Sequence, residues 1–326
     1  MIVNFGGGLG NQMFMYAFAK ALQMEGCEVI IDGSAFNTNG GGNRVDSNPH
    51  PRHLEIEHFN ISMPITRDFC VESLYKKFDA RRFWRYHIKN KIRKLRGRKP
   101  KTYSYRFLRY ESPQMLEDKN LIANSAKLPN HTYFCGCFQH LHCFSHIAPT
   151  IRKEFTLKTP LNHANQVLKN RILNTKDATF LHIRRGDYMQ IPHFIKLATG
   201  YYNGALRAIL ARVANPHIFV FSDDMDFAEK YLLKCLDSTL TSAVKWDFVK
   251  SNNENNAACE MELMRVCQNA IIANSTFSWW AAYLIDNPRK VVVMPNRFFY
   301  DDTIPKVSYI KPNGYIEIDY NWGFEV

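Results

Sequence analysis

The chain of 326 residues is 46% hydrophobic and 13% aromatic and has no membrane-spanning apolar run, which excludes a mainly disordered or transmembrane protein. Its eight cysteines make no disulfide scaffold, and the lack of a basic region followed by an apolar stretch at the start predicts a cytoplasmic protein. The formal net charge of +12 is uneven, because residues 76–109 carry +14, from fifteen Lys or Arg and one Asp.

The chain is predicted to begin with a β–loop–α–β unit. It consists of a strand, a glycine-rich turn, a helix and a second strand, at residues 1–5, 6–10, 11–24 and 27–32. The turn and Asp32 resemble a dinucleotide-binding fingerprint, but Asn11 stands where that pattern has its third glycine. This partial match makes an NAD-dependent oxidoreductase the alternative hypothesis for function. Residues 33–66, rich in Asn, Gly, Pro and His, predict a long irregular segment.

A basic amphipathic helix is predicted near residues 78–95, within the basic segment 76–109. Four large apolar residues recur there at helical spacing, namely Trp84, Ile88, Ile92 and Leu95. A helix of this kind predicts peripheral contact with an anionic membrane, on the inner face if the protein is cytoplasmic. Packing of the apolar stripe on its own domain is the main alternative. A solvated helix, an RNA-binding surface and a site for an acidic acceptor are others.

Thiol and imidazole groups gather in one stretch of the first half. They are Cys135, Cys137, His140, His142, Cys143 and His146. A zinc site usually has a clip of two cysteines separated by two residues, and this stretch lacks one. We therefore predict no metal site here and expect reduced, buried thiols.

The second half alternates strands with helices, which predicts an α/β fold with a parallel sheet covered on both faces. The predicted strands are residues 179–184, 217–222, 270–273 and 290–294, and the predicted helices lie near 202–213, 225–233, 258–267 and 276–285. A boundary near residues 150–160 divides the chain into two α/β domains. The first, over residues 1–155, holds the basic insertion, and the second covers residues 156–326.

One predicted strand of the second half ends in two arginines. His182 and Arg184 point to the same face of this strand. Arg185 and Asp187 lie in the turn at its carboxyl end, where open α/β sheets bind ligands. Adjacent guanidinium groups suit a diphosphate, because each can hold oxyanions bidentately. A surface turn held by salt bridges is the alternative.

Two further strand ends carry polar side chains. Ser222, Asp223 and Asp224 end the strand 217–222; the two carboxylates could bind Mg²⁺ or ribose hydroxyls, or Asp224 could cap the next helix. After the strand 270–273, polar side chains open a helix at Asn274, Ser275, Thr276 and Ser278. The free N–H groups and the dipole of that helix start predict an anion site. An ordinary capped helix is the alternative, and Trp279 and Trp280 are expected in the core.

At these residues the sequence resembles the bacterial α-1,2-fucosyltransferases of glycosyltransferase family 11. The matching motifs are GGLGNQMF at residues 7–14, HIRRGDY at 182–188, FSDD at 221–224 and IANSTFSWW at 272–280. The resemblance runs from residue 6 to about residue 295 and is weakest over residues 33–130. Four motifs in the same order are specific together, although each alone is not.

The resemblance implies two facing Rossmann-like domains in the GT-B arrangement, with the nucleotide in the C-terminal half and the acceptor in the N-terminal half. It implies transfer of L-fucose from GDP-fucose, with inversion, to an acceptor oligosaccharide or lipid-linked glycan. The linkage would be α-1,2 to galactose, in the synthesis of a polysaccharide or O-antigen. It implies no metal or other cofactor, and no nucleic acid as a partner.

The family's donor site falls on ten positions of this sequence. They are His182, Arg184, Arg185, Ser222, Asp223, Glu260, Asn274, Ser275, Thr276 and Ser278. Arg184 and Arg185 would hold the diphosphate and stabilise the charge of the departing GDP. Glu260, where related enzymes usually have Asp, would accept hydrogen bonds from guanine N1–H and N2–H, which adenine lacks.

Five further positions complete the predicted site. Asp187 is a candidate for the base that takes the acceptor proton, with a salt bridge or turn cap as the alternative role. Asn11 would orient the donor or the acceptor beside Gln12. The predicted glycine loop at the border of the cleft consists of Gly8, Gly10, Asn11 and Gln12.

Overall fold

The structure is a computed structural model, and it describes residues 1–36, 53–67, 80–99, 108–250, 256–301 and 306–326. Parts of the predicted irregular segment 33–66 and of the basic segment 76–109 therefore lie outside the described residues. Within the described residues, no helix is both long and apolar enough to cross a bilayer.

The first half is built on a five-stranded parallel sheet in the order β3-β2-β1-β5-β4. Its strands are β1 (Ile2–Asn4), β2 (Ile30–Asp32), β3 (Ile65–Thr66), β4 (Leu108–Tyr110) and β5 (Tyr133–Cys135). Its helices are α1 (Leu9–Met24), α3 (Ala80–Leu95), α4 (Pro113–Glu117) and α5 (Ala148–Glu154). The predicted strand 27–32 is shorter in the structure, because the N–H of Cys27 donates to the carbonyl of Leu22 and closes the end of α1.

The second half is built on a six-stranded parallel sheet in the order β11-β10-β9-β6-β7-β8. Its strands are β6 (Ala178–Ile183), β7 (His217–Ser222), β8 (Lys245–Phe248), β9 (Asn269–Ile271), β10 (Val292–Pro295) and β11 (Ile316–Ile318). Its main helices are α6 (His163–Leu173), α7 (Thr199–Leu210), α11 (Ala257–Arg265) and α12 (Thr276–Leu284). The predicted helix 225–233 is α8 (Met225–Phe227), a π-helical turn (Ala228–Leu232) and α9 (Leu233–Cys235); α10 (Ser238–Ser242) and α13 (Val307–Ile310) are short.

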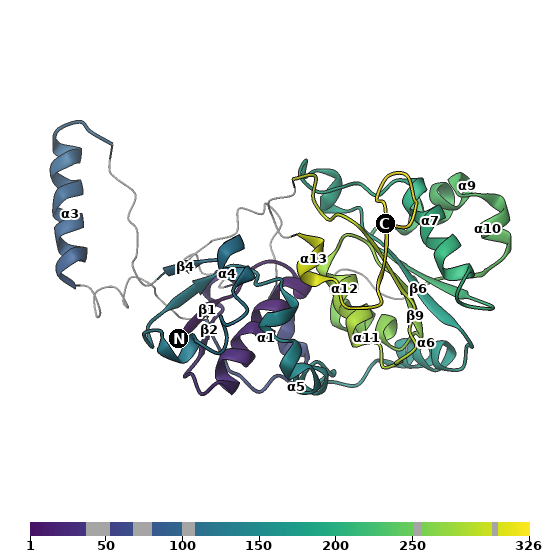
Figure 1. The fold of residues 1–326 in the computed structure, drawn as a ribbon, viewed down its shortest axis with the longest axis horizontal. Helices are drawn as coiled ribbons and strands as arrows, with labels where there is room; N and C mark the ends of the chain where they lie inside the picture. The colour runs from purple at the N-terminus through teal and green to yellow at the C-terminus, as the bar shows by residue number, and fades with distance from the viewer. Residues whose placement is uncertain (37–52, 68–79, 100–107, 251–255, 302–305) are drawn as a thin grey trace.

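The strand order of each sheet shows at which edge a ligand would bind. In the second sheet the direction of winding reverses between β6 and β9, and such a switch point leaves a crevice at the carboxyl ends of the two strands. In the first sheet β1 occupies the equivalent place, between β2 and β5. The prediction of an α/β fold with two facing Rossmann-like domains is confirmed (Figure 1).

The two halves share one hydrophobic core, in which α1 packs directly against α12 (Figure 1). The ring of Phe14 lies 4.8 Å from that of Trp279 and 4.9 Å from that of Trp280, and all three side chains are fully buried. The expectation that both tryptophans lie in the core is therefore confirmed. The indole N–H of Trp280 also donates to the carbonyl of Gly10 across the boundary, at 3.0 Å. The core thus fixes the starts of α1 and α12 beside one another.

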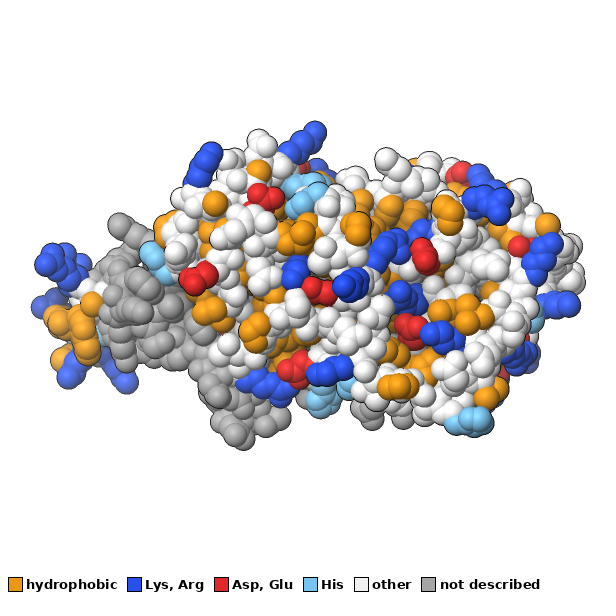
Figure 2. Space-filling view, turned by 90° about the horizontal axis from the view of Figure 1, so that it is seen from below, with side chains coloured by type: hydrophobic (Ala, Val, Ile, Leu, Met, Phe, Trp, Pro, Cys, Tyr) orange, Lys and Arg blue, Asp and Glu red, His pale blue; other side chains and the backbone are white. Residues whose placement is uncertain are grey.

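Helix α3 stands away from the rest of the molecule (Figure 1). Its four apolar residues are exposed, by 58% at Trp84, 56% at Ile88, 43% at Ile92 and 81% at Leu95. The alternative that this stripe packs on its own domain is therefore wrong for the described residues. Figure 2 shows basic and hydrophobic side chains together at this end of the molecule. The helix contains seven basic residues and no acid.

Candidate active site

A cleft of about 570 Å³ lies between the two halves, a volume typical of ligand sites. The first half lines it with the glycine loop after β1 and with two residues of the segment before residue 56. The second half lines it with the carboxyl ends of β6 and β7, the loop after β6, and the starts of α11 and α12. The predicted site residues that reach it are Gly8, Gly10, Asn11, His182, Arg184, Asp187, Ser222, Asp223, Glu260, Ser275 and Thr276.

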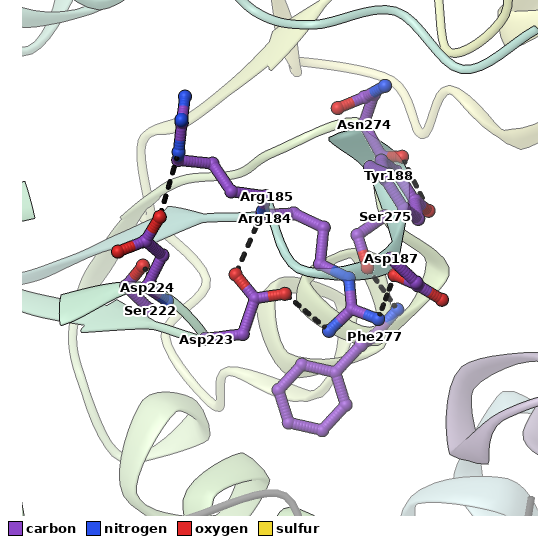
Figure 3. A network of polar contacts seen from close by, with 10 residues as sticks. All are labelled: Arg184, Arg185, Asp187, Tyr188, Ser222, Asp223, Asp224, Asn274, Ser275 and Phe277. Carbon is purple, nitrogen blue, oxygen red and sulfur yellow. Dashed lines mark hydrogen bonds and ion pairs between the residues drawn. The ribbon is translucent and has the colours of Figure 1, made fainter. Parts of the chain in front are cut away.

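Arg184 is the cation that β6 presents to the cleft. The register of β6 and β7 places Ile183 opposite Ser222, so the next residues, Arg184 and Asp223, meet at the sheet edge. Figure 3 shows the Arg184 guanidinium between two carboxylates, 2.7 Å from Asp187 and 2.9 Å from Asp223. Gly186 permits this arrangement, because a Cβ atom there would lie 2.6 Å from a carboxylate oxygen of Asp223. The paired carboxylates hold the fork in one orientation.

Arg185 points away from the cleft, as expected for alternate side chains of an extended chain (Figure 3). Its Nε atom lies 3.1 Å from a carboxylate oxygen of Asp224, and its guanidinium carbon lies 3.5 Å from the ring centre of Phe227. Its backbone N–H donates to Asp223 at 2.8 Å. The structure therefore brings only one of the two predicted arginine side chains into the cleft.

The titratable groups around Arg184 have shifted pKa values. Burial and then the charge of Arg184 lower the pKa of His182 to about 3, so its imidazole is neutral at neutral pH. Burial raises the pKa of Glu260 to about 7; the charge of Asp223 raises it further, while that of Arg184 lowers it. Burial also raises the pKa of Asp223. Perturbed groups that gather in one cleft are typical of a functional site.

The starts of α1 and α12 meet at the floor of the cleft. Ser275 caps α12, its hydroxyl accepting the N–H of Phe277 at 3.3 Å, as the sequence predicts. The hydroxyl of Thr276 donates to the side-chain oxygen of Asn11 across the two halves, at 3.1 Å. A Cβ atom on Gly10 would lie 2.5 Å from backbone and side-chain atoms of Thr276, so this approach requires glycine. Two positive helix ends therefore face the same space.

Several predicted site residues support the cleft without lining it. Asn274 is buried and donates to the carbonyls of Ile195 and Phe298, and Ser278 donates to the carbonyl of Ser275. Asp224 accepts the N–H of Phe227, which is the capping role left open above. Gln12 is fully buried, and its amide fixes the segment before residue 56 to the glycine loop.

Other residues of the cleft are absent from the sequence-based prediction. They include His53, Glu55, Tyr188, Ile191, His193 and Phe194. The rings of Tyr188 and Phe194 stack with centres 3.9 Å apart, and the Tyr188 hydroxyl donates to the carbonyl of Asn274 at 3.2 Å. The available signal was the alternation of polar with apolar residues at 53–56, within a segment predicted only as irregular.

The thiol and imidazole groups of residues 135–146 lie in the first half. Across the described ranges, no three His, Cys, Asp or Glu side chains are arranged to hold a metal ion. Cys135 and Cys143 are buried free thiols whose pKa burial raises to about 12. The His140 ring stacks on Tyr309, with ring centres 4.6 Å apart. These side chains therefore pack within the fold.

Two Rossmann-type sheets that present an arginine, carboxylates and helix starts to a shared cleft define a two-domain α/β protein of the class that typically binds nucleotides. The family model described as glycosyl transferase family 11 matches residues 84–317. The O-antigen biosynthesis glycosyltransferase WbnK of Escherichia coli is 31% identical over 322 residues, covering 93% of this chain and 96% of that protein. The chain therefore belongs to glycosyltransferase family 11.

Further similarities extend over most of the chain. The α-1,2-colitosyltransferase of Escherichia coli is 27% identical over 307 residues, covering 92% of each protein. The crystal structure of the α-1,6-fucosyltransferase NodZ soaked with GDP-fucose matches 87% of this chain and 92% of its own. The TM-score of this match is 0.44, and the two sequences are 16% identical.

Proposed function

We propose that this glycosyltransferase moves L-fucose from GDP-fucose, with inversion, to a galactose hydroxyl of an acceptor glycan in α-1,2 linkage. The observation that carries the proposal is the fixed Arg184 fork facing the starts of α1 and α12 in one cleft. Support for the sugar and the linkage comes from relatives named as O-antigen, α-1,2-colitosyl- and α-1,2-fucosyltransferases. The acceptor is an oligosaccharide or a lipid-linked glycan.

The alternative of an NAD-dependent oxidoreductase has no support. Asp32, the residue that would bind a ribose, is buried and accepts hydrogen bonds from Tyr133 and from the N–H of Ser34. The backbone at Gly10 is covered by Thr276, which leaves no space there for a pyrophosphate. Family membership points to sugar transfer instead.

The proposed reaction breaks the bond between fucose C1 and the β-phosphate oxygen, and the bonding electron pair leaves with GDP. Arg184 and the start of α12 stabilise the negative charge that grows on the phosphate. Glu260, inside the cleft, accepts the N1–H and N2–H of guanine. Because fixed cationic and dipolar groups already serve the phosphate, the proposal includes no metal ion.

Turnover is expected to persist in excess EDTA. The test supplies the purified protein with GDP-fucose, GDP-colitose or UDP-galactose and a galactose-terminated acceptor, and measures product with and without chelator. Fucose transfer that EDTA leaves unchanged supports the proposal. If EDTA abolishes transfer and Mg²⁺ or Mn²⁺ restores it, the metal-free part is wrong; if only another donor is used, the fucose assignment is wrong.

We also propose that α3 holds the enzyme at the cytoplasmic face of an anionic membrane, where lipid-linked acceptors occur. The support is a helix with seven basic residues, no acid and an exposed apolar stripe. Such a helix can insert its apolar face at the lipid boundary while its basic residues meet anionic headgroups.

Sedimentation with vesicles tests this membrane contact. Binding is expected to require anionic lipid, to weaken with salt and to fall when four residues become Gln: Arg93, Lys94, Arg96 and Arg98. A control removes the same charge elsewhere, from Arg207, Lys230, Lys234 and Lys250, and is expected to bind as the unchanged protein does. Equal binding to neutral vesicles, or binding to neither kind, would leave α3 without this role.

A further inference from the structure

The segment 53–56 forms the wall of the cleft on the side of the first half. One buried side chain holds it there, because both functional groups of the Gln12 amide bond to it. The amide NH₂ donates to the carbonyls of Gly7 and His53, at 3.0 and 2.8 Å. The amide oxygen accepts the N–H groups of Glu55 and Ile56, at 3.0 and 3.1 Å. The segment is thereby tied to the glycine loop.

Alternate side chains of this segment have opposite environments. Leu54 and Ile56 are buried in the core of the first half. His53 and Glu55 line the cleft. The Gln12 hydrogen bonds fix which residues face which way, so Gln12 acts as a positioning residue for Glu55.

Four carboxylate side chains line the described part of the cleft, and their surroundings differ. Asp187 and Asp223 both bond to Arg184. Glu260 is half-buried and feels the charge of Asp223. These three belong to the second half, on the donor side of the cleft. Glu55 comes from the first half, opposite the arginine that would hold the donor phosphate.

An inverting transfer needs its base on the face of the sugar opposite the departing phosphate. We infer that Glu55 is the catalytic base that takes the proton from the acceptor hydroxyl, with His53 beside it in the acceptor subsite. The acceptor oxygen forms its bond to fucose C1 as the bond from C1 to the phosphate oxygen breaks. The proton passes to the Glu55 carboxylate, and the electron pair of the broken bond leaves with GDP. This inference rests on the proposed function and replaces Asp187 as the base.

The variant Glu55→Gln keeps the size of the side chain and removes the proton acceptor. Its kcat for fucose transfer is expected to fall at least about a hundredfold, the usual contribution of a general base. GDP affinity is expected to stay within about twofold of the unchanged protein, because Glu55 lies outside the donor side. At saturating GDP-fucose, where the ionisation of Glu260 no longer limits donor binding, the acidic limb of the kcat profile is expected to disappear. Glu55→Asp, which retains a carboxylate, is expected to recover part of the rate.

Glu57→Gln is the matched control. Glu57 lies two residues along the same segment, outside the cleft, and forms an ion pair with Arg67 at the surface. Its kcat and pH profile are expected to remain unchanged, and thermal unfolding of all variants verifies the fold.

An unchanged kcat or an intact acidic limb in Glu55→Gln overturns the inference and leaves the proposed function standing. Loss of the acidic limb in His53→Gln, with Glu55→Gln near normal, overturns it too, because the base would then be His53. If the unchanged protein binds no GDP and transfers no sugar, the proposed function fails and the inference fails with it.

Discussion

Arg184→Lys is expected to lower fucose transfer by about 10²–10³-fold while the protein stays folded. The magnitude is that typical of removing one preorganised donor to a developing oxyanion. Lysine retains the positive charge, so Asp187 and Asp223 keep a cationic partner, but it lacks the planar fork that these two carboxylates hold in place. The loss should appear in kcat more than in the acceptor KM, because the phosphate gains charge as the bond breaks.

The measurement is steady-state transfer with GDP-fucose, alongside thermal unfolding, and Arg185→Lys is the comparison. In the structure the Arg185 side chain contacts Asp224 and Phe227 outside the cleft. A smaller loss in Arg185→Lys is expected from this orientation. An equal loss would show that its guanidinium turns into the cleft with the donor, as the sequence-based pairing of the two arginines requires. Full activity in Arg184→Lys would show that the planar guanidinium group of Arg184 has no role in the mechanism.

Glu260→Gln is expected to weaken GDP binding on the order of a hundredfold, because an amide NH₂ would then face a donor of guanine. The effect also depends on pH. The pKa of Glu260 lies near 7, so the folded protein holds its proton more tightly than the unfolded chain does. The resulting stability is present below the ordinary carboxyl pKa and is lost as pH rises toward 7. Guanine needs the ionised form, so binding should tighten as pH increases.

Calorimetric titration with GDP at about pH 6 and about pH 8 separates the ionisation of Glu260 from that of the GDP phosphate. The phosphate of GDP titrates in both proteins, so the decisive quantity is the difference between the unchanged protein and Glu260→Gln. Affinity in the unchanged protein should rise about tenfold more than in the variant over this range. Equal pH dependence in the two proteins, or equal preference for GDP and ADP, would place guanine elsewhere.

The convergence of the motifs could be predicted, because residues after parallel strands meet at one edge of a sheet. Arg184, Asp223 and Thr276 follow three strands of the second sheet and line one cleft for that reason, and Asn11 follows β1, which has the equivalent place in the first sheet. Which of the small polar residues line the cleft could not be predicted equally well. Asn274 and Ser278 stand in the same motif as Ser275, yet they bond to backbone carbonyls beneath the cleft. Sequence position does not reveal which buried backbone groups need a partner.

The cleft wall at residues 53–56 was less predictable because its backbone has no regular period. The orientation of His53 and Glu55 depends on hydrogen bonds with Gln12, which is 41 and 43 residues away in the chain, rather than on a strand or helix repeat. The apolar stripe of α3 shows a different limit of prediction from sequence. Its spacing predicted the helix correctly, but spacing alone cannot tell a stripe that faces a core from one that faces solvent.

The core shared by α1 and α12 limits how this enzyme can be recombined with its relatives. Besides the contact of Phe14 with two tryptophans, Arg152 in α5 donates to the carbonyls of Tyr283 and Leu284 at the far end of α12. Helix α12, which starts at the floor of the cleft, is thus anchored at both ends by the first half. A chimera that joins the second half of one family member to the first half of another must therefore carry both faces of this interface together. Exchange at the predicted boundary near residues 150–160 would instead pack the two indole rings against a surface that does not fit them.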